Sequence, residues 1–139
     1  MAIMALSNQN KIFDPVRRIW VVATPEEKVR QMLIAHMISP LGYPKELMAV
    51  EVYLKECERR VDIVCYGRGK SSLFPLLIIE CKQKKIDELT MQQVLGYNYH
   101  VQAHFIAIAN HEEIRVRYGD KMINYLPHYH ELLRAIEPS

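Results

Sequence analysis

Two acids and one lysine stand near the ends of two neighbouring apolar segments. Asp62 lies early in the segment Arg60–Tyr66, and Glu80 and Lys82 close the segment Pro75–Lys82. Both segments are rich in Val, Ile and Leu, which is typical of short buried strands. Carboxylates are almost never buried without a partner, so acids at these positions indicate either a specific polar contact or a functional site.

The loop Gly67–Ser72 separates the two segments and has the composition of a turn, so we expect the segments to pair as a hairpin. That pairing brings Asp62 opposite or near Glu80, where two carboxylates repel each other unless a cation lies between them. Carboxylate oxygens suit magnesium or manganese, and the nearby Lys82 can orient a water molecule or stabilise negative charge on a phosphate. A salt bridge of Lys82 with Glu80 or Asp62 is the alternative interpretation.

The surrounding patterns predict an α/β fold that places this hairpin in the middle of a sheet. Further strands are expected at Met48–Leu54, Ala103–Ala109, Ile114–Tyr118 and residues 121–125, with a hairpin or edge strand within residues 13–23. Helices are expected at residues 24–38, Asp87–His100 and Tyr129–Ile136. Residues 1–10 are expected to form a loose arm.

The first expected helix begins at Thr24 and Pro25, because threonine caps a helix N-terminus and proline suits the first helical position. Its predicted apolar stripe consists of Val29, Met32, Leu33, His36 and Met37. Glu26 is spaced to lie on this inward stripe, whereas Glu27 is expected to be rotated away from it. Both acids also complement the helix dipole, which is the simpler explanation for them.

The composition indicates one globular domain spanning residues 1–139, with 50% apolar and 24% charged residues. A net charge of +2 permits contact with nucleic acid through a local patch but does not require it. Three cysteines without a CxxC pair predict a reducing, cytoplasmic location and no disulfide framework. No secretory leader or membrane span is expected, and Arg17 and Arg18 are expected to face solvent.

Six stretches, taken together, are similar to a known family: Lys11–Pro15, Thr24–Gln31, Leu41–Pro44, Arg60–Val64, Leu77–Lys82 and Gln93–Asn98. They resemble the N-terminal nuclease domain of type I restriction enzyme R subunits, within the PD-(D/E)xK nuclease superfamily. The resemblance extends over about residues 11–118 of the chain. It implies a restriction-endonuclease-like core, in which an α-β-β-β-α-β order of elements surrounds a mixed central sheet.

The resemblance also implies roles for the matching residues. Asp62 and Glu80 would be ligands of Mg²⁺, with Mn²⁺ as a possible substitute, and Lys82 would be the catalytic lysine. Glu26 would match the acid that the family often places on its first helix, where it supports the metal directly or through water. Val61 stands where the motif that names the superfamily has proline.

Several residues are expected to contact DNA. Gln93 and Tyr97 match the family's Q-x-x-x-Y element, which positions the DNA backbone and groups of the active site, so the resemblance implies that Gln93 is also a catalytic residue. Lys84 and Lys85 follow the central hairpin, and with Arg60 they would guide the backbone without reading its sequence. A solvated loop is the alternative interpretation of the two lysines.

The leading hypothesis is a magnesium-dependent endonuclease that hydrolyses DNA phosphodiester bonds. Because the 139 residues hold no Walker motif and no helicase motor, we expect a stand-alone nuclease-like domain. The alternatives are a non-catalytic DNA-binding or assembly module with the same fold, and an α/β domain that binds a small ligand. Cutting both strands with a single site usually needs two copies, so a homodimer is the expected state, with other subunits of a restriction or repair system as further candidate partners.

Overall fold

A computed structural model gives the arrangement of residues 10–138, so the arm predicted for residues 1–10 falls almost wholly outside the described residues. Within the described range, six strands form one sheet in the order β3-β4-β5-β6-β7-β8. The strands are β3 (Met48–Leu54), β4 (Arg59–Arg68), β5 (Leu73–Cys81), β6 (Phe105–Ala109), β7 (Ile114–Tyr118) and β8 (Lys121–Ile123). Strands β5 and β6 run parallel and the other neighbours run antiparallel, so the predicted mixed sheet with a central β4–β5 hairpin is confirmed.

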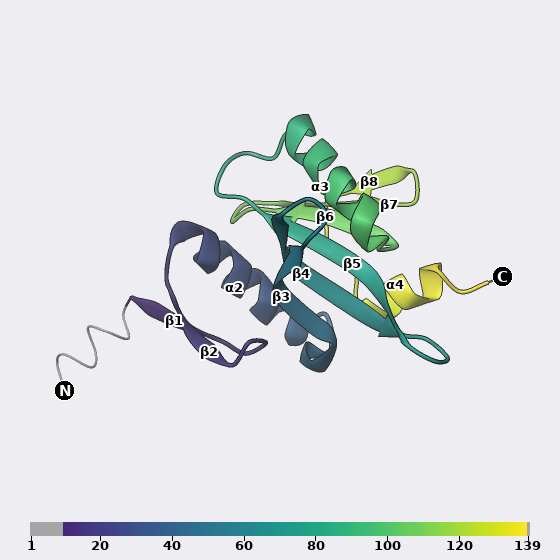
Figure 1. Cartoon of the computed structure of the whole chain (residues 1–139), viewed down its shortest axis with the longest axis horizontal. Helices are drawn as coiled ribbons and strands as arrows, with labels where there is room; N and C mark the ends of the chain where they lie inside the picture. Colours follow the sequence, from purple (N-terminus) through teal and green to yellow (C-terminus); the bar gives the residue numbers. More distant parts are fainter. Residues whose placement is uncertain (1–9, 139) are drawn as a thin grey trace.

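Helices cover both faces of the sheet (Figure 1). The helices α2 (Pro25–Ile38) and α4 (Tyr129–Ala135) pack on one face, while α3 (Glu88–Val101) packs on the other and provides the crossover that the parallel β5–β6 pair needs. The elements from α2 to β6 therefore follow the predicted α-β-β-β-α-β order, with a short 3₁₀ helix, η1 (Lys45–Leu47), before β3. No helix in the described part of the chain is long and apolar enough to cross a bilayer.

The predicted hairpin near the N-terminus is confirmed, but it forms a separate two-stranded sheet from β1 (Lys11–Asp14) and β2 (Ile19–Val22). The hairpin lies beside α2 (Figure 1). Arg18 is exposed, as predicted, and has a positive φ of 59° in the tight connection. The prediction that Arg17 faces solvent is wrong, because its side chain is only 20% exposed and forms ion pairs toward α2 and β3.

Helix α2 begins as predicted, but its buried face is rotated. The Thr24 hydroxyl accepts a hydrogen bond from the backbone N–H of Glu27 and caps the helix. Met32 is 52% exposed and His36 is also exposed, so both were wrongly assigned to the apolar stripe. The buried apolar positions of the helix are Val29, Leu33, Ile34 and Met37.

Strand β4 changes face at Asp62. Val61 packs in the core cluster under α3, whereas Ile63 packs in the cluster under α2 and α4. Regular alternation would place these two residues on one face of the sheet. The β3–β4 ladder skips the intervening pair, where Glu51 has a φ of 53°, so the Asp62 side chain lies at an interruption of the ladder.

Candidate active site

Asp62 is held between α2 and β5. The last backbone pair between β4 and β5 at this end of the strands is Ile63 and Ile79. Beyond that pair, the Asp62 carboxylate takes over as the acceptor for the backbone N–H of Cys81 on β5. Its Oδ2 accepts a hydrogen bond of 2.7 Å from the backbone N–H of Cys81, and its Oδ1 accepts one of 2.5 Å from Nη2 of Arg30. The side chain is thereby fixed in place although it is almost fully buried.

Glu80 lies beside Asp62, as the hairpin register predicted, and is 8% exposed. Its Oε1 is buried and has no hydrogen-bond partner among the described residues. Burial raises the pKa of Glu80 to about 9, with further contributions from a hydrogen bond to Asp62 and from the Asp62 charge, against an opposing effect of Lys82. At neutral pH this carboxylate therefore holds a proton or requires a cation.

Lys82 and Glu26 approach the same two acids. Lys82 directly follows β5, and its backbone N–H donates to the carbonyl of Ala109 on β6. Its ammonium group acts to lower the pKa of Glu80 and of Glu26. Burial and the charge of Asp62 nevertheless raise the pKa of Glu26, which stands in the first turn of α2 with its side chain 49% exposed. The structure thus brings together Glu26, Asp62, Glu80 and Lys82 of the predicted catalytic and metal set, which also includes Gln93.

The two residues of the predicted Q-x-x-x-Y element, Gln93 and Tyr97, lie on different sides of α3. Tyr97 is half-buried, and burial together with the charge of Glu80 raises the pKa of its phenol. Gln93 lies on the exposed side of the helix. Tyr97 therefore approaches the acids, whereas Gln93 faces solvent.

The predicted basic DNA contacts lie at the surface. Lys84 and Lys85 are exposed in the segment between β5 and α3. Arg60 is exposed on β4, with its guanidinium 5.6 Å from the centre of the Tyr53 ring. These three residues are accessible to a ligand, and Arg60 is held against β3 rather than against the acids.

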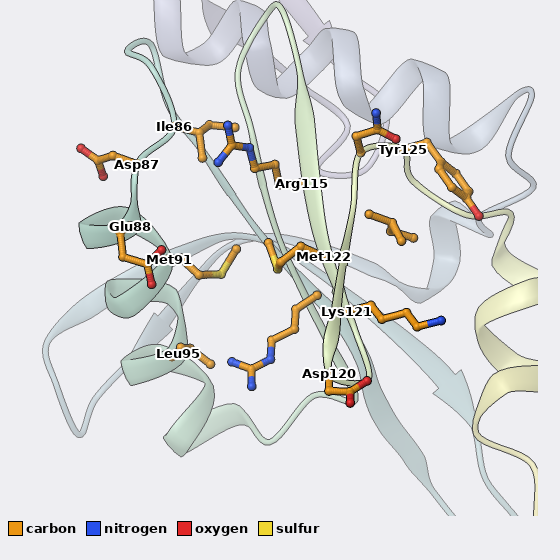
Figure 2. A pocket seen from close by; sticks show the side chains of 13 residues that line it. Ile86, Asp87, Glu88, Met91, Leu95, Arg115, Asp120, Lys121, Met122 and Tyr125 are labelled. Carbon is orange, nitrogen blue, oxygen red and sulfur yellow. The ribbon is translucent and has the colours of Figure 1, made fainter.

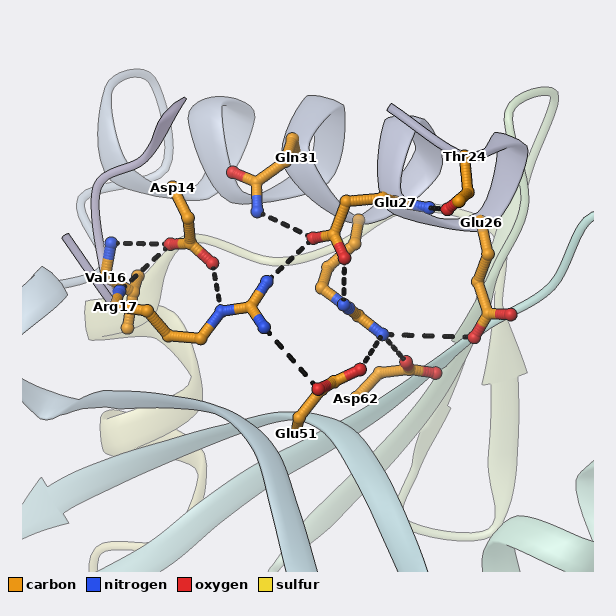
Figure 3. A network of polar contacts seen from close by, with 10 residues as sticks. Asp14, Val16, Arg17, Thr24, Glu26, Glu27, Gln31, Glu51 and Asp62 are labelled. Carbon is orange, nitrogen blue, oxygen red and sulfur yellow. Dashed lines mark hydrogen bonds and ion pairs between the residues drawn. The ribbon is translucent and has the colours of Figure 1, made fainter. Parts of the chain in front are cut away.

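Sequence analysis missed the buried polar network beneath α2 (Figure 3). The prediction that Glu27 is rotated away from the core is wrong, because Glu27 is 8% exposed and Glu26 is the exposed acid of the pair. Glu27 accepts hydrogen bonds from Arg30 at 2.5 Å, from Arg17 at 2.8 Å and from Gln31 at 3.0 Å. The spacing of Glu27, Arg30 and Gln31 by three and four residues was the signal that could have placed them on one helix face.

Arg17 connects this network to the β1–β2 hairpin. Its Nε donates to Asp14 at 2.6 Å, and its Nη1 lies 3.5 Å from Glu51 of β3. Asp14 is fully buried. Burial acts to raise the pKa of Asp14, but hydrogen bonds from Arg17 and from backbone N–H groups outweigh this effect and lower it.

The acids fit a hydrated divalent ion rather than a complete cage of protein ligands. Within residues 10–138, no group of three or more His, Cys, Asp or Glu side chains is arranged to hold a metal. Oε1 of Glu80 is buried without a hydrogen-bond donor among the described residues, and it lies beside the Asp62 carboxylate. A magnesium ion held by one or two carboxylates keeps several waters, which suits this donor set.

A separate groove of about 720 Å³ lies between α3 and the β7–β8 hairpin (Figure 2). Its lining includes Met91 and Leu95 of α3 together with Arg115, Arg117 and Met122 of the hairpin. None of the predicted site residues lines it. The groove is therefore distinct from the acid cluster around Asp62 and Glu80.

Comparisons with curated proteins and with solved structures found no match. The family described as type I restriction enzyme R protein N terminus matches residues 25–134. This range extends from α2 into α4 and contains Asp62, Glu80 and Lys82. Because the match covers well over half of the chain, the chain belongs to the family of type I restriction enzyme R protein N-terminal domains.

Proposed function

We propose that this chain is a divalent-metal-dependent DNA endonuclease with a restriction-endonuclease-like core of the PD-(D/E)xK type. Membership of a restriction-enzyme family supports a role connected with DNA cleavage. The observation that carries the proposal is the buried, unpartnered Oε1 of Glu80 beside Asp62. A buried acceptor without a donor is costly, and a bound cation removes that cost.

In the proposed mechanism, Asp62 and Glu80 would hold Mg²⁺, with Glu80 binding as the carboxylate after giving its proton to solvent. When bound, Mg²⁺ polarises the phosphate and makes a water easier to deprotonate. Lys82 orients the attacking water and offsets the negative charge that develops on the phosphate. Glu26, whose side chain is half exposed, would support the ion through water. Hydrolysis leaves a phosphate on one new end and a hydroxyl on the other.

DNA would reach these residues along the exposed basic surface. Lys84, Lys85 and Arg60 neutralise backbone phosphates without contacting base edges. Tyr97 and Gln93 on α3 position the backbone next to the acids. Other subunits of a restriction system and a second copy of the chain are the proposed protein partners.

The test is nicking of supercoiled plasmid with magnesium, compared with the same reaction in EDTA. Asp62→Asn should lower the nicking rate on the order of 100-fold, because it removes a charged ligand while preserving side-chain size. Asp120→Asn is the matched control, since Asp120 is exposed in the turn between β7 and β8 and should leave the rate unchanged. The enzymatic proposal would be refuted if the wild type and Asp62→Asn nicked the plasmid at the same rate and that rate were the same in magnesium and in EDTA.

A non-catalytic DNA-binding module is the second candidate, and one observation favours it. The Arg30 guanidinium already neutralises Asp62 without any metal. If the module hypothesis holds, the wild-type protein retains DNA at low salt but does not nick it, and Asp62→Asn leaves retention unchanged. Retention should then fall when Lys84 and Lys85 are both replaced by Gln.

A further inference from the structure

Arg30 is a buried cation at the centre of four carboxylates. Its side chain is 4% exposed, and its two terminal nitrogens donate to Glu27 and Asp62 at 2.5 Å each. Nη2 also lies 3.4 Å from Glu51 and 3.9 Å from Glu26. Figure 3 shows these acids, drawn from α2, β3 and β4, pointing toward the same guanidinium.

This guanidinium occupies the position next to Oδ1 of Asp62, where a metal shared with Glu26 or Glu51 would have to bind. An ion bridging Asp62 to Glu26 or Glu51 would have to lie within about 2.5 Å of their oxygens. Nη2 of Arg30 already stands among those three oxygens, and like charges so close together repel strongly.

Glu80 lies beside Asp62 at the end of β5 and forms no ion pair with Arg30. Glu80, with more than nine-tenths of its surface buried, presents Oε1 without a hydrogen-bond partner among the described residues. The acid cluster is thus divided between a region filled by an arginine and a region with an unsatisfied acceptor.

We propose that Arg30 is a built-in cation that restricts the site to a single divalent ion, held between Asp62 and Glu80. This inference rests on the proposed function, because it assumes that the two acids bind a divalent metal. Arg30 acts as a positioning residue: it holds Asp62 in place in the absence of metal and excludes a second ion from the α2 side.

The count of bound ions tests this directly. Mn²⁺ binding is measured by the electron paramagnetic resonance of free Mn²⁺ during a titration, and the count for Asp62→Asn is subtracted to isolate the acid cluster. We expect one ion per wild-type chain. Two ions would overturn the inference and leave the proposed metal site standing, whereas no Asp62-dependent ion would overturn the proposed function and this inference together.

Replacing the arginine should open the second position. Arg30→Met removes the charge but keeps an extended side chain, so the count should rise from one to two. Arg17→Met is the matched control, because Arg17 binds Glu27 and Glu51 but not Asp62, and the count should stay at one. A folded Arg30→Met protein that still binds one ion would contradict the proposal, and if this variant does not fold, the wild-type count decides alone.

Discussion

Two regions of the molecule use arginine in opposite ways. Beneath α2, Arg30 and Arg17 are enclosed by carboxylates and lie largely out of contact with solvent. Arg115 and Arg117 line the groove beside α3, come from alternate positions of β7 and are exposed. Among the described residues, the ion-pair partner of Arg115 is Glu113, at the surface.

The difference shows which charges the fold depends on. A buried charge is tolerated only when its partners replace water, so removing one member exposes the others to the full cost of desolvation. An exposed charge keeps its hydration, and its removal changes stability little. The α2 network therefore fixes the geometry of Asp62, while the groove arginines stay hydrated at the surface.

Arg30→Met should have the largest effect on stability. It leaves Asp62 and Glu27 as buried carboxylates without their main cation, which should lower the free energy of unfolding by about 3–5 kcal/mol. Urea unfolding in EDTA, followed by circular dichroism, measures this loss. Lys28→Met on the exposed side of the same helix is the control and should stay within about 0.5 kcal/mol. Equal stability of the two variants would show that the network does not hold α2 to the sheet.

Most of the fold could be predicted because local signals agreed with tertiary structure. The Thr24 cap and the apolar strands of the central hairpin each specify their element without help from distant residues. The predicted loop Gly67–Ser72 was too long, because Gly67 and Arg68 pair with β5 and only residues 69–72 connect the strands. The pairing of two strands across a short loop then placed Asp62 beside Glu80. These predictions needed only periodicity and chain connectivity.

The network beneath α2 could not be predicted in the same way. A stripe defined by apolar residues assigns Arg30 and Glu27 to the surface, because their burial depends on partners contributed by other elements. The positive φ of Glu51 has no sequence signal either, since glutamate rarely adopts this conformation. Long-range charge pairing, rather than helix periodicity, decided which face of α2 turned inward.

The pH dependence of stability should distinguish the unsatisfied acid from the paired ones. The pKa of Glu80 is raised from 4.5 to about 9, so the folded chain binds more protons than the unfolded chain between these values. In EDTA, the free energy of unfolding should therefore fall as pH rises through this window. The loss of unfolding free energy between pH 5 and pH 7 should be smaller than the loss caused by Arg30→Met, because Glu80 is still protonated at pH 7. Thermal unfolding from pH 5 to pH 9 measures it.

Two comparisons assign that pH dependence to Glu80. Glu80→Gln should flatten the profile, since the amide does not titrate, whereas Glu112→Gln at an exposed position should preserve it. Saturating magnesium should also reduce the slope, because the ion replaces the proton. A wild-type profile that rises or stays level from pH 5 to pH 9 without metal would show that Glu80 is not held in its protonated form.

The smallest effect is expected in the groove. Arg117→Gln removes an exposed charge that has no ion-pair partner among the described residues, so the free energy of unfolding should change by less than about 0.5 kcal/mol. Met91→Gln in the same groove is the contrasting variant, because Met91 is 7% exposed and packs in the core cluster under α3. Parallel urea titrations should show a clear loss for Met91→Gln and almost none for Arg117→Gln. A loss for Arg117→Gln as large as that for Arg30→Met would remove the distinction between the two regions, because it would mean that the groove arginine also holds the fold together.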